Sequence, residues 1–400
     1  MPGIYKTPGV HIESAGDRHI PLEAVETGVT AFLGISDTGP RNKPVLVTTS
    51  EQYEKLFGQS DTFLSHAVHG FFDNGGVKAY VLNCKRGALV APDDFIGTQG
   101  TDKRGLRLLE DLDDVDLIVA PSLMEHYRNS PMLAAPEDLA AVQLAMVAHC
   151  ERLHSRFAIL DCPPEMSRAE IQEYRQQFDS SFAAMYYPWI RVRVGDEPSP
   201  PIVPGGHVAG MFAKADRTVG VHRTAANMPI EGLVDVERLI HKKERDLLFE
   251  HEVNGIYPFP GRGIRIWGSR TLSSDPSWTQ INVRRLMILI RKSIERYAQW
   301  VVFEPNEPAL WKKLTRTIDS FLFDLFKEGA LVGGTKEEAF YVKCDEETNP
   351  PESRDVGQLI CEIGIAPVRP AEFIVVRIHQ WTREASGQKV EPDEDVGTPP

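Results

Sequence analysis

Residues 64–84 read LSHAVHGFFDNGGVKAYVLNC, and this stretch carries the pattern that decides the fold. Its first half places apolar residues at helical intervals, Gly75 and Gly76 interrupt that period, and VKAYVLNC follows as a short apolar run. A helical period, a glycine break and an apolar run of strand length together predict a helix that leads into a buried strand.

The same alternation extends along the chain on both sides of this stretch. Helical periods, including two near 136–153 and 167–178, separate short apolar runs of strand length. These runs are VTAFLGIS (29–36), DVDLIVAPS (114–122), RFAILDCPP (156–164) and FAAMYYPWIRV (182–192). Strands that alternate with helices predict an α/β arrangement with a largely parallel sheet.

The last third of the chain changes in character. The segment VRRLMILIRKSIERYAQWVV (283–302) has the period of an amphipathic helix, and a second helical repeat runs from Leu310 to Phe326. Strand patterns follow at 339–344, 357–366 and 372–381. This order predicts a compact α+β unit after the α/β region.

Composition and charge exclude several classes of protein. The chain has 400 residues, 42% of them hydrophobic and 25% charged, which is enough to bury more than one core. A formal net charge of -13 argues against a general nucleic-acid binder, whose phosphate contacts need a basic face. There is no run of about 18 apolar residues, so we expect no insertion into a membrane. Because Met1-Pro2-Gly3 opens neither a basic nor an apolar segment, we expect no secretory signal and a protein that is made and kept in a cytoplasm.

The cysteines indicate no disulfide framework and no zinc site. They are odd in number, scattered, and without a pair at zinc-ribbon or redox spacing, which predicts buried reduced thiols. The five are Cys84, Cys150, Cys162, Cys344 and Cys361.

Histidine pairs are the first place to look for a metal site. His66 and His69 with Asp73 could share one side of a helix, and His149 and His154 flank a cysteine. Neither spacing matches a ligand pattern with a mechanism behind it. We therefore interpret these side chains as helix-surface or core-edge histidines and assign no metal.

Candidates for catalysis and cofactor binding are equally weak. The glycine pairs at 75–76, 205–206 and 333–334 lack the GxxxxGK[ST] form of a phosphate-binding loop and are predicted to be turns. Asp161 ends the predicted strand in FAILD, where open α/β sheets often keep a site, but no nucleophile or base can be assigned to it. We assign no catalytic residue and no cofactor.

The helix within 283–302 carries a basic stripe. A helical projection places Arg285, Lys292 and Arg296 nearly opposite its main apolar face, with Ile288 and Leu289 beside them. Such charges usually mark a solvated face. Mixed basic and apolar character would also suit a partner with an acidic surface, because steering is electrostatic and central contacts are apolar.

The final strand pattern has no obvious partner in its own chain. Ile374, Val376 and Ile378 alternate with Phe373 and Val375 across two faces. Prolines just before this segment exclude a tight hairpin, and only a polar tail follows it. Its backbone donors and acceptors still need partners.

Motifs distributed over the whole chain resemble those of tail sheath proteins from contractile-tailed phages, phage-tail-like bacteriocins and extracellular contractile injection systems. The motifs are TPGVHIE (7–13), TAFLGISDTGP (30–40), HAVHGFFDNGGVKAYV (66–81), VPGGHVAGMFAKAD (203–216), GIRIWGSRTLSSDPSWTQINVRRL (263–286), WVVFEPNEPALW (300–311) and RPAEFIVVRIHQ (369–380).

This resemblance implies an α/β outer domain plus an α+β C-terminal sheath core domain with extended N- and C-terminal arms. The expected bounds are an arm at 1–21, the outer domain at 22–278 with room for two subdomains, the core at 279–370, and an arm strand with a polar tail at 371–400.

The resemblance also implies a non-enzymatic subunit that polymerises helically around an inner tube and contracts to drive the tube through a target envelope. Its expected partners are further copies of itself, the tube protein, and baseplate and tail-terminator proteins. Arms would add strands to neighbouring subunits. The expected arm residues are Val10, Ile12, Phe373, Ile374, Val375, Val376 and Ile378, and the expected tube-facing residues are Arg285, Ile288, Leu289, Lys292 and Arg296.

Two alternatives stay open at this point. A specialised baseplate or cap paralogue would form a single ring, and a soluble α/β enzyme with an oligomerisation domain would form a discrete oligomer that binds a ligand. The sequence alone does not separate a phage tail from an injection system or a bacteriocin.

Overall fold

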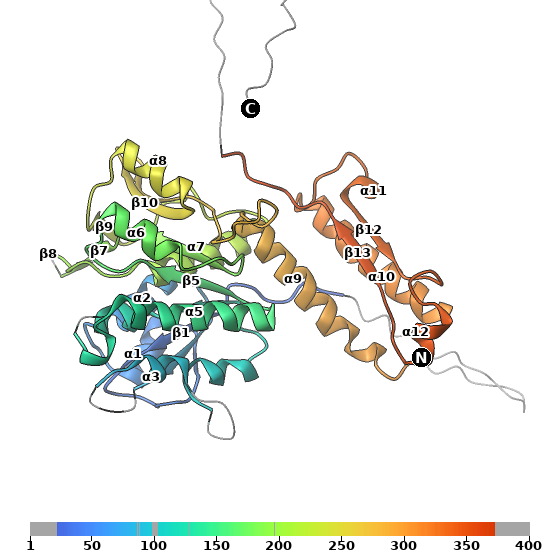
Figure 1. Cartoon of the computed structure of the whole chain (residues 1–400), viewed down its shortest axis with the longest axis horizontal. Coiled ribbons are helices and arrows are strands. Elements are labelled where there is room, and N and C mark those ends of the chain that lie inside the picture. Colours follow the sequence, from blue (N-terminus) through green and yellow to red (C-terminus); the bar gives the residue numbers. More distant parts are fainter. Residues whose placement is uncertain are drawn as a thin grey trace, which may run out of the picture. The chain divides into compact units, whose positions relative to one another are not determined.

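The computed structural model describes residues 22–372, except 86, 88, 98–102, 128 and 196 (Figure 1). The chain divides into two units, Met1–Arg369 and Pro370–Pro400. The elements below all belong to the first unit. The predicted arm residues Val10 and Ile12, and the predicted strand from Phe373 onward, lie outside the described residues.

An eight-stranded sheet with the order β11-β10-β6-β5-β4-β1-β3-β2 organises the larger part of the unit. Neighbouring strands are parallel except at the two edges, where β2 pairs with β3 and β11 with β10 antiparallel. The largely parallel sheet predicted from the alternation is confirmed. The strands are β1 Thr30–Gly34, β2 Val45–Val47, β3 Ala79–Asn83, β4 Leu117–Val119, β5 Phe157–Asp161, β6 Ala183–Tyr187, β10 Val253–Phe259 and β11 Gly263–Trp267.

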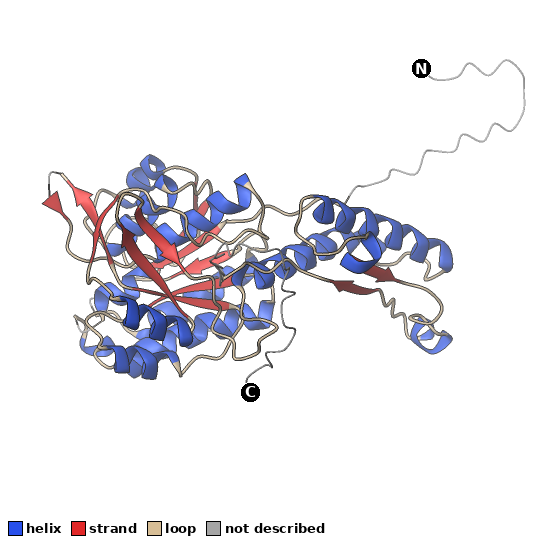
Figure 2. Ribbon diagram, turned by 90° about the horizontal axis from the view of Figure 1, so that it is seen from above, coloured by secondary structure: helices blue, strands red, loops and turns tan. Residues whose placement is uncertain are grey.

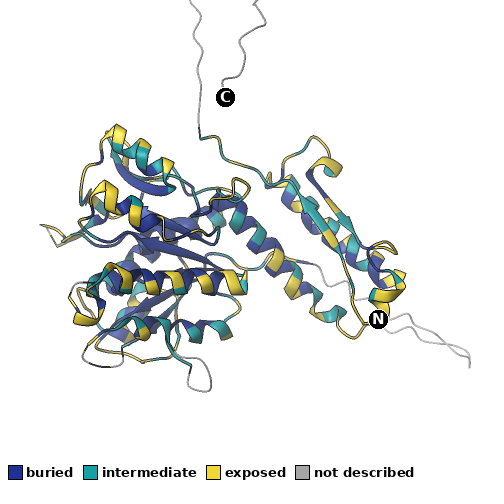
Figure 3. Ribbon diagram, in the orientation of Figure 1, coloured by how far each residue is buried: buried dark blue, intermediate teal, exposed yellow. Residues whose placement is uncertain are grey.

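Helices cover both faces of this sheet (Figure 2). The central strands are therefore mostly apolar and buried, and Figure 3 shows them in the buried colour. The helices of this part are α1 Ser50–Phe57, α2 Phe63–Asp73, α3 Pro92–Ile96, α4 Pro121–His126, α5 Pro136–Leu153, α6 Arg168–Arg175, α7 Gly205–Thr218 and α8 Lys242–Glu250, with 3-10 turns η1 Gly105–Asp111 and η2 Pro131–Leu133.

The stretch FAAMYYPWIRV forms two strands, although one was predicted. Its first half is β6 of the large sheet, and its second half is β7 Ile190–Val194 of a three-stranded sheet with β8 Glu197–Pro198 and β9 Leu233–Val236. Pro188 lies between the halves and has no N–H to donate, so the pairing ends there.

Glycines let α2 and α7 approach closely. A Cβ at Gly206 would lie 2.4 Å from the carbonyl oxygen of Ala67, and one at Gly70 would lie 2.3 Å from the ring of His207. The prediction of a turn at 205–206 is wrong, because both glycines belong to the first turn of α7. Gly75, with φ of 97°, does lie in a turn after α2.

The C-terminal part of this unit has an apolar core of its own. Its elements are α9 Ile281–Ala298, η3 Gln299–Val301, α10 Pro308–Lys327, α11 Lys336–Ala339, β12 Phe340–Lys343, α12 Pro351–Asp355 and β13 Glu362–Ile365. β12 and β13 form a two-stranded antiparallel sheet. α9 contributes to both cores, since Ile288 packs in the larger one and Leu286 and Ile290 in the smaller one.

Candidate assembly surfaces

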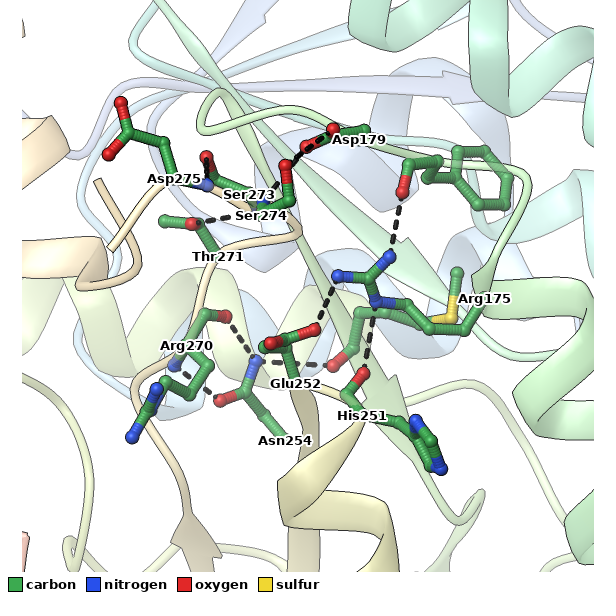
Figure 4. Close-up of polar contacts among 12 residues, drawn as sticks. Arg175, Asp179, His251, Glu252, Asn254, Arg270, Thr271, Ser273, Ser274 and Asp275 are labelled. Atoms are coloured by element: carbon green, nitrogen blue, oxygen red, sulfur yellow. Dashed lines mark hydrogen bonds and ion pairs between the residues drawn. The ribbon is translucent and has the colours of Figure 1, made fainter. Parts of the chain in front are cut away.

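A connector of residues 268–280 joins β11 to α9, and polar contacts hold it to the large sheet (Figure 4). The Arg270 N–H donates to Asn254 Oδ1 at 2.8 Å, and Asn254 Nδ2 donates back to the Arg270 carbonyl at 2.8 Å. The N–H and hydroxyl of Ser274 both donate to the Asp179 carboxylate, at 2.9 and 2.7 Å. These contacts attach the segment between β11 and α9 to the large sheet, and they give Ser274 of the WGSRTLSSDPSW motif a structural role.

The first turns of α9 are bound to the same body. The Arg284 guanidinium lies 3.7 Å from the ring centroid of Trp278 and 4.2 Å from that of Phe182, which is cation–π geometry. Its Nη2 also donates to Ser181 Oγ at 2.5 Å. Residues 268–280 and the first turns of α9 are therefore both attached to the part of the chain that is built on the large sheet.

Arg285 is the strongest link between α9 and the sheet. Its Nη1 and Nη2 donate to Asp216 Oδ1 and Oδ2 at 2.8 and 2.6 Å, and Nη2 also donates to Asp116 Oδ2 at 2.6 Å. Asp116 Oδ2 additionally accepts from the Gly28 N–H at 2.9 Å. This buried triad is charge-assisted and bidentate, the geometry in which arginine binds carboxylates best.

The triad changes the proton affinity of its members. Burial opposes the charge on Asp116, but the cations of Arg285 and Lys292 outweigh it and leave the Asp116 pKa below its ordinary value. Burial raises the pKa of Asp216, which Arg285 lowers only in part. Burial likewise opposes the cation of Arg285, but Asp216 and Asp116 hold its pKa above the ordinary value.

Four of the five residues expected to face the tube are buried within the described chain, so the expectation of an open basic and apolar face on α9 is wrong for these four. Arg285 is 4% exposed and Lys292 9%, and the Lys292 ammonium donates to the Val115 carbonyl at 3.1 Å. Ile288 and Leu289 are buried too. These residues are buried because α9 lies between the two apolar cores. The face of α9 that carries Arg285 and Lys292 therefore contacts carboxylates and a carbonyl of the part built on the large sheet (the sheet body) instead of water. Arg296 alone is exposed.

A two-stranded sheet leaves strand edges open. Among the described residues, β12 and β13 pair only with each other, so each strand has an edge without a backbone partner. A groove of about 330 Å³ runs between β13 and one face of α9. Its lining is mostly apolar and consists of Met287, Ile290, Arg291, Ile294, Glu295, Ile363 and Ile365.

This groove has the features that an added strand needs. Ile363 and Ile365 are two residues apart and so lie on the same face of β13. A strand that hydrogen-bonds to the free edge of β13 would place alternate side chains in the groove. The groove was not predicted from the sequence, although the strand pattern at 357–366 and the apolar face of 283–302, which supply its two walls, are both visible there.

The candidates for chemistry have structural partners. Asp161 is buried, and its Oδ1 accepts from the Gly205 N–H at 2.9 Å, at the start of α7. Burial raises the pKa of Asp161 to about 7. His66 pairs with Asp61 at 2.6 Å and His69 with Glu54 at 2.9 Å.

Metal ligands do not cluster in the part of the chain that the structure describes. No group of three or more His, Cys, Asp or Glu side chains is arranged there to hold a metal ion. His149 is buried, and its Nε2 lies 3.1 Å from Arg156 Nη1. His154 is the C-cap residue of α5 and has a φ of 54°. Within the same residues, no helix is both long and apolar enough to span a bilayer.

Family models match two adjacent parts of the chain. The phage tail sheath protein central domain matches residues 116–272, and the phage tail sheath C-terminal domain matches residues 273–380. The chain belongs to the phage tail sheath family, a family of structural sheath proteins, as its motifs indicated.

Proteins with similar sequences are also named as tail sheath proteins. The tail sheath protein of Escherichia phage P2 is 22% identical over 381 residues, which cover 88% of this chain and 91% of that one. A Pseudomonas aeruginosa protein named as a prophage major tail sheath protein is 29% identical over 265 residues. This match covers 63% of this chain and 66% of the Pseudomonas protein, and a Vibrio phage tail sheath protein is matched over 26% of its length.

Solved structures agree over nearly the whole chain. The helical sheath of the anti-feeding prophage in its contracted state matches with a TM-score of 0.77 and 26% identity, covering 94% of this chain and all of that one. The contracted sheath complex of the extracellular contractile injection system PVC matches with a TM-score of 0.74 and 25% identity, over 94% and 98% of the two chains. The fold is thus that of contractile, phage-tail-like sheath subunits.

Proposed function

We propose that this chain is the structural subunit of a contractile sheath, which polymerises helically around an inner tube and contracts to drive that tube through a target envelope. Family membership supports the class, and the open edge of β13 beside an apolar groove is the observation that carries the polymerisation step. Its partners are further copies of the chain, the tube protein, and baseplate and tail-terminator proteins. Assembly takes place in the bacterial cytoplasm, and the work needs no catalysis.

The C-terminal arm of another copy is the proposed occupant of the groove. Its pattern from Phe373 to Ile378 alternates apolar side chains, which matches an apolar groove on one side of a strand edge. Arg291 and Glu295 at the groove allow polar contacts at its rim. Backbone hydrogen bonds tolerate rotation between subunits, so arms of this kind keep a lattice connected while its subunits move.

The energy for contraction comes from the lattice in this proposal. Burial of apolar surface contributes roughly 25 cal/mol per Å². An extra burial of roughly a few hundred Å² per subunit in the contracted form therefore supplies several kcal/mol, multiplied along the polymer. The rigid support that joins α9 to the sheet body would transmit this movement.

Truncation of the arm tests the polymerisation step. Removing residues 373–400 leaves all described residues in place, and removing 383–400 is the matched control because it spares the alternating segment. We expect both variants to fold with the same circular dichroism, and only the shorter truncation to form striated cylinders in negative-stain electron microscopy with the tube protein. Cylinders formed by the 373–400 deletion would overturn the arm proposal.

A ring-forming paralogue is the second candidate. A structure of the anti-feeding prophage baseplate matches this chain with a TM-score of 0.74 and 26% identity, over 95% of this chain and all of the other. The same micrographs separate the two candidates: long cylinders support the main sheath subunit, and single closed rings support the paralogue. Discrete small particles at every concentration, with tube protein present, would overturn both.

A further inference from the structure

Two cysteines face each other across the two-stranded sheet. The last paired residues of this sheet are Lys343 of β12 and Glu362 of β13. One further step along the same register places Cys344 opposite Cys361. Each thiol also shifts the pKa of the other through a side-chain interaction, as expected for neighbouring side chains.

The position of the pair in the ladder favours a bond between them. The Ala366 N–H donates to the Ala339 carbonyl at 2.9 Å, so this opposed pair is a hydrogen-bonded one. Antiparallel pairs alternate in type, which makes Cys344 and Cys361 a non-hydrogen-bonded pair, with Cα atoms about 4.5 Å apart. Disulfides span Cα separations of about 4.4–6.8 Å, so the backbone need not move far for these thiols to join.

The surroundings give the two thiols different access. Cys344 is 9% exposed, and its sulfur accepts a weak hydrogen bond from Asn349 Nδ2 at 3.7 Å. Cys361 is half-buried and packs against the same core. The other three cysteines of the chain are each fully buried. A soluble oxidant therefore reaches Cys361 first.

We propose that Cys344 and Cys361 form an intrachain disulfide when the chain meets a small-molecule disulfide such as oxidised glutathione. The Cys361 thiolate attacks one glutathione sulfur, which forms a mixed disulfide and releases one glutathione. Cys344 then attacks the Cys361 sulfur and releases the second glutathione. Two S–H bonds are lost and one S–S bond forms, while two electrons and two protons pass to glutathione.

Burial sets the rate of this step. It raises the pKa of Cys361 to about 12 and that of Cys344 above its ordinary value. The thiolate is the attacking species, so the reaction is slow near neutral pH and accelerates as pH rises. A disulfide that forms this slowly has a structural role, because neither thiol has the reactivity of a catalytic cysteine.

The Cys344–Cys361 disulfide would hold β12 and β13 in one register. It closes the loop that carries α12 and in which Asn349 exchanges two hydrogen bonds with Ile360. A slip of one residue would turn Ile363 and Ile365 away from the groove that they line. The oxidation itself depends only on the fold of one chain, so its test is independent of the proposed sheath function.

The experiment oxidises the full chain and looks for the bond directly. The protein is incubated with oxidised glutathione at pH 7 and pH 9, blocked under denaturing conditions, and digested with trypsin. Cleavage after Lys343 and Arg354 puts the two cysteines on separate peptides, so the disulfide appears as a linked pair that reduction separates. We expect titratable thiols to fall from five to three, and to fall faster at pH 9.

Variants control for other thiol chemistry. Cys361→Ser, at the half-buried position, should keep its remaining four thiols and lose the rise in Tm of about 5 °C expected for the oxidised wild type. Cys344→Ser should accumulate only the glutathione adduct of Cys361. A wild-type chain that keeps five thiols, carries the adduct alone, or links Cys344 to another copy would overturn the proposal.

Discussion

Arg285 of α9 forms a two-point ion pair with Asp216 of α7, with N–O distances of 2.8 and 2.6 Å, and both side chains are almost fully buried. Because Asp116 shares the same guanidinium, one cation on α9 compensates two carboxylates of the sheet body. The attachment of α9 to the sheet body is thus ionic as well as apolar.

Removal of Arg285 should be costly. Arg285→Met removes the cation that is hydrogen-bonded to both Asp216 and Asp116, and breaking a buried ion pair in this way destabilises a protein by about 3–5 kcal/mol. Urea unfolding of the two proteins measures this difference. The variant that also carries Asp116→Leu and Asp216→Leu should recover much of the loss, because the two carboxylates that Arg285 pairs with are then absent, while the buried Lys292 ammonium keeps its hydrogen bond to the Val115 carbonyl. A loss below about 1 kcal/mol for Arg285→Met would contradict this account.

Asp161 should make stability depend on pH. Its folded pKa of about 7 lies above the ordinary value of 3.8, so the folded state binds this proton more tightly than the unfolded chain does. The stability from this proton is complete below pH 3.8 and is lost as pH rises to 7.

The variant Asp161→Asn isolates this effect. Asparagine cannot ionise, and its oxygen can still accept from the Gly205 N–H. Relative to wild type, the variant should gain a few kcal/mol between pH 4 and pH 8, since each unit of pKa shift corresponds to about 1.4 kcal/mol. Urea unfolding at several pH values gives the difference. Glu125, whose pKa burial also raises to about 7, is present in both proteins and cancels. A difference that does not change with pH would exclude this explanation.

The close contact of α2 with α7 should not tolerate a larger residue. A Cβ at Gly206 would meet the backbone oxygen of Ala67 at 2.4 Å, and backbone cannot move aside as a side-chain end can. We expect Gly206→Ala to destabilise the protein by about 1–3 kcal/mol, seen as a lower Tm. Gly87→Ala is the control, since a Cβ there would meet nothing within 4 Å. Equal Tm values for the two variants would show that the helices can separate at no cost.

We still predict that Arg296 contacts the tube, because it is the one exposed residue of the five expected there. Arg296→Glu should slow sheath nucleation on tubes at least about threefold and weaken its dependence on salt, since steering between charged surfaces is electrostatic. Light scattering with added tubes measures this rate. Lys55→Glu, an equal change of charge on an exposed position of α1, should nucleate like wild type. If both variants nucleate at the same rate, Arg296 is only solvated surface.

Individual strands and helices were predicted correctly where the hydrophobic period of the sequence was clear. The apolar runs of β1, β3 and β5 and the helix at 136–153 were predicted close to their observed bounds, because strand and helix periods are set by neighbouring residues. The family followed from motifs spread along the whole chain. The groove was not predicted, because its two walls, α9 and β13, are separated by about 65 residues of sequence.

The basic stripe of α9 shows where local reasoning stops. The sequence by itself determined that α9 is a helix with cations on one side and apolar residues on both. Only the tertiary structure decided that Arg285 and Lys292 are buried, because their partners Asp116, Asp216 and Val115 stand far away in the chain. A helical projection contains no information about what packs on a face, and burial of charge depends on whether an opposite charge or a carbonyl is folded against it.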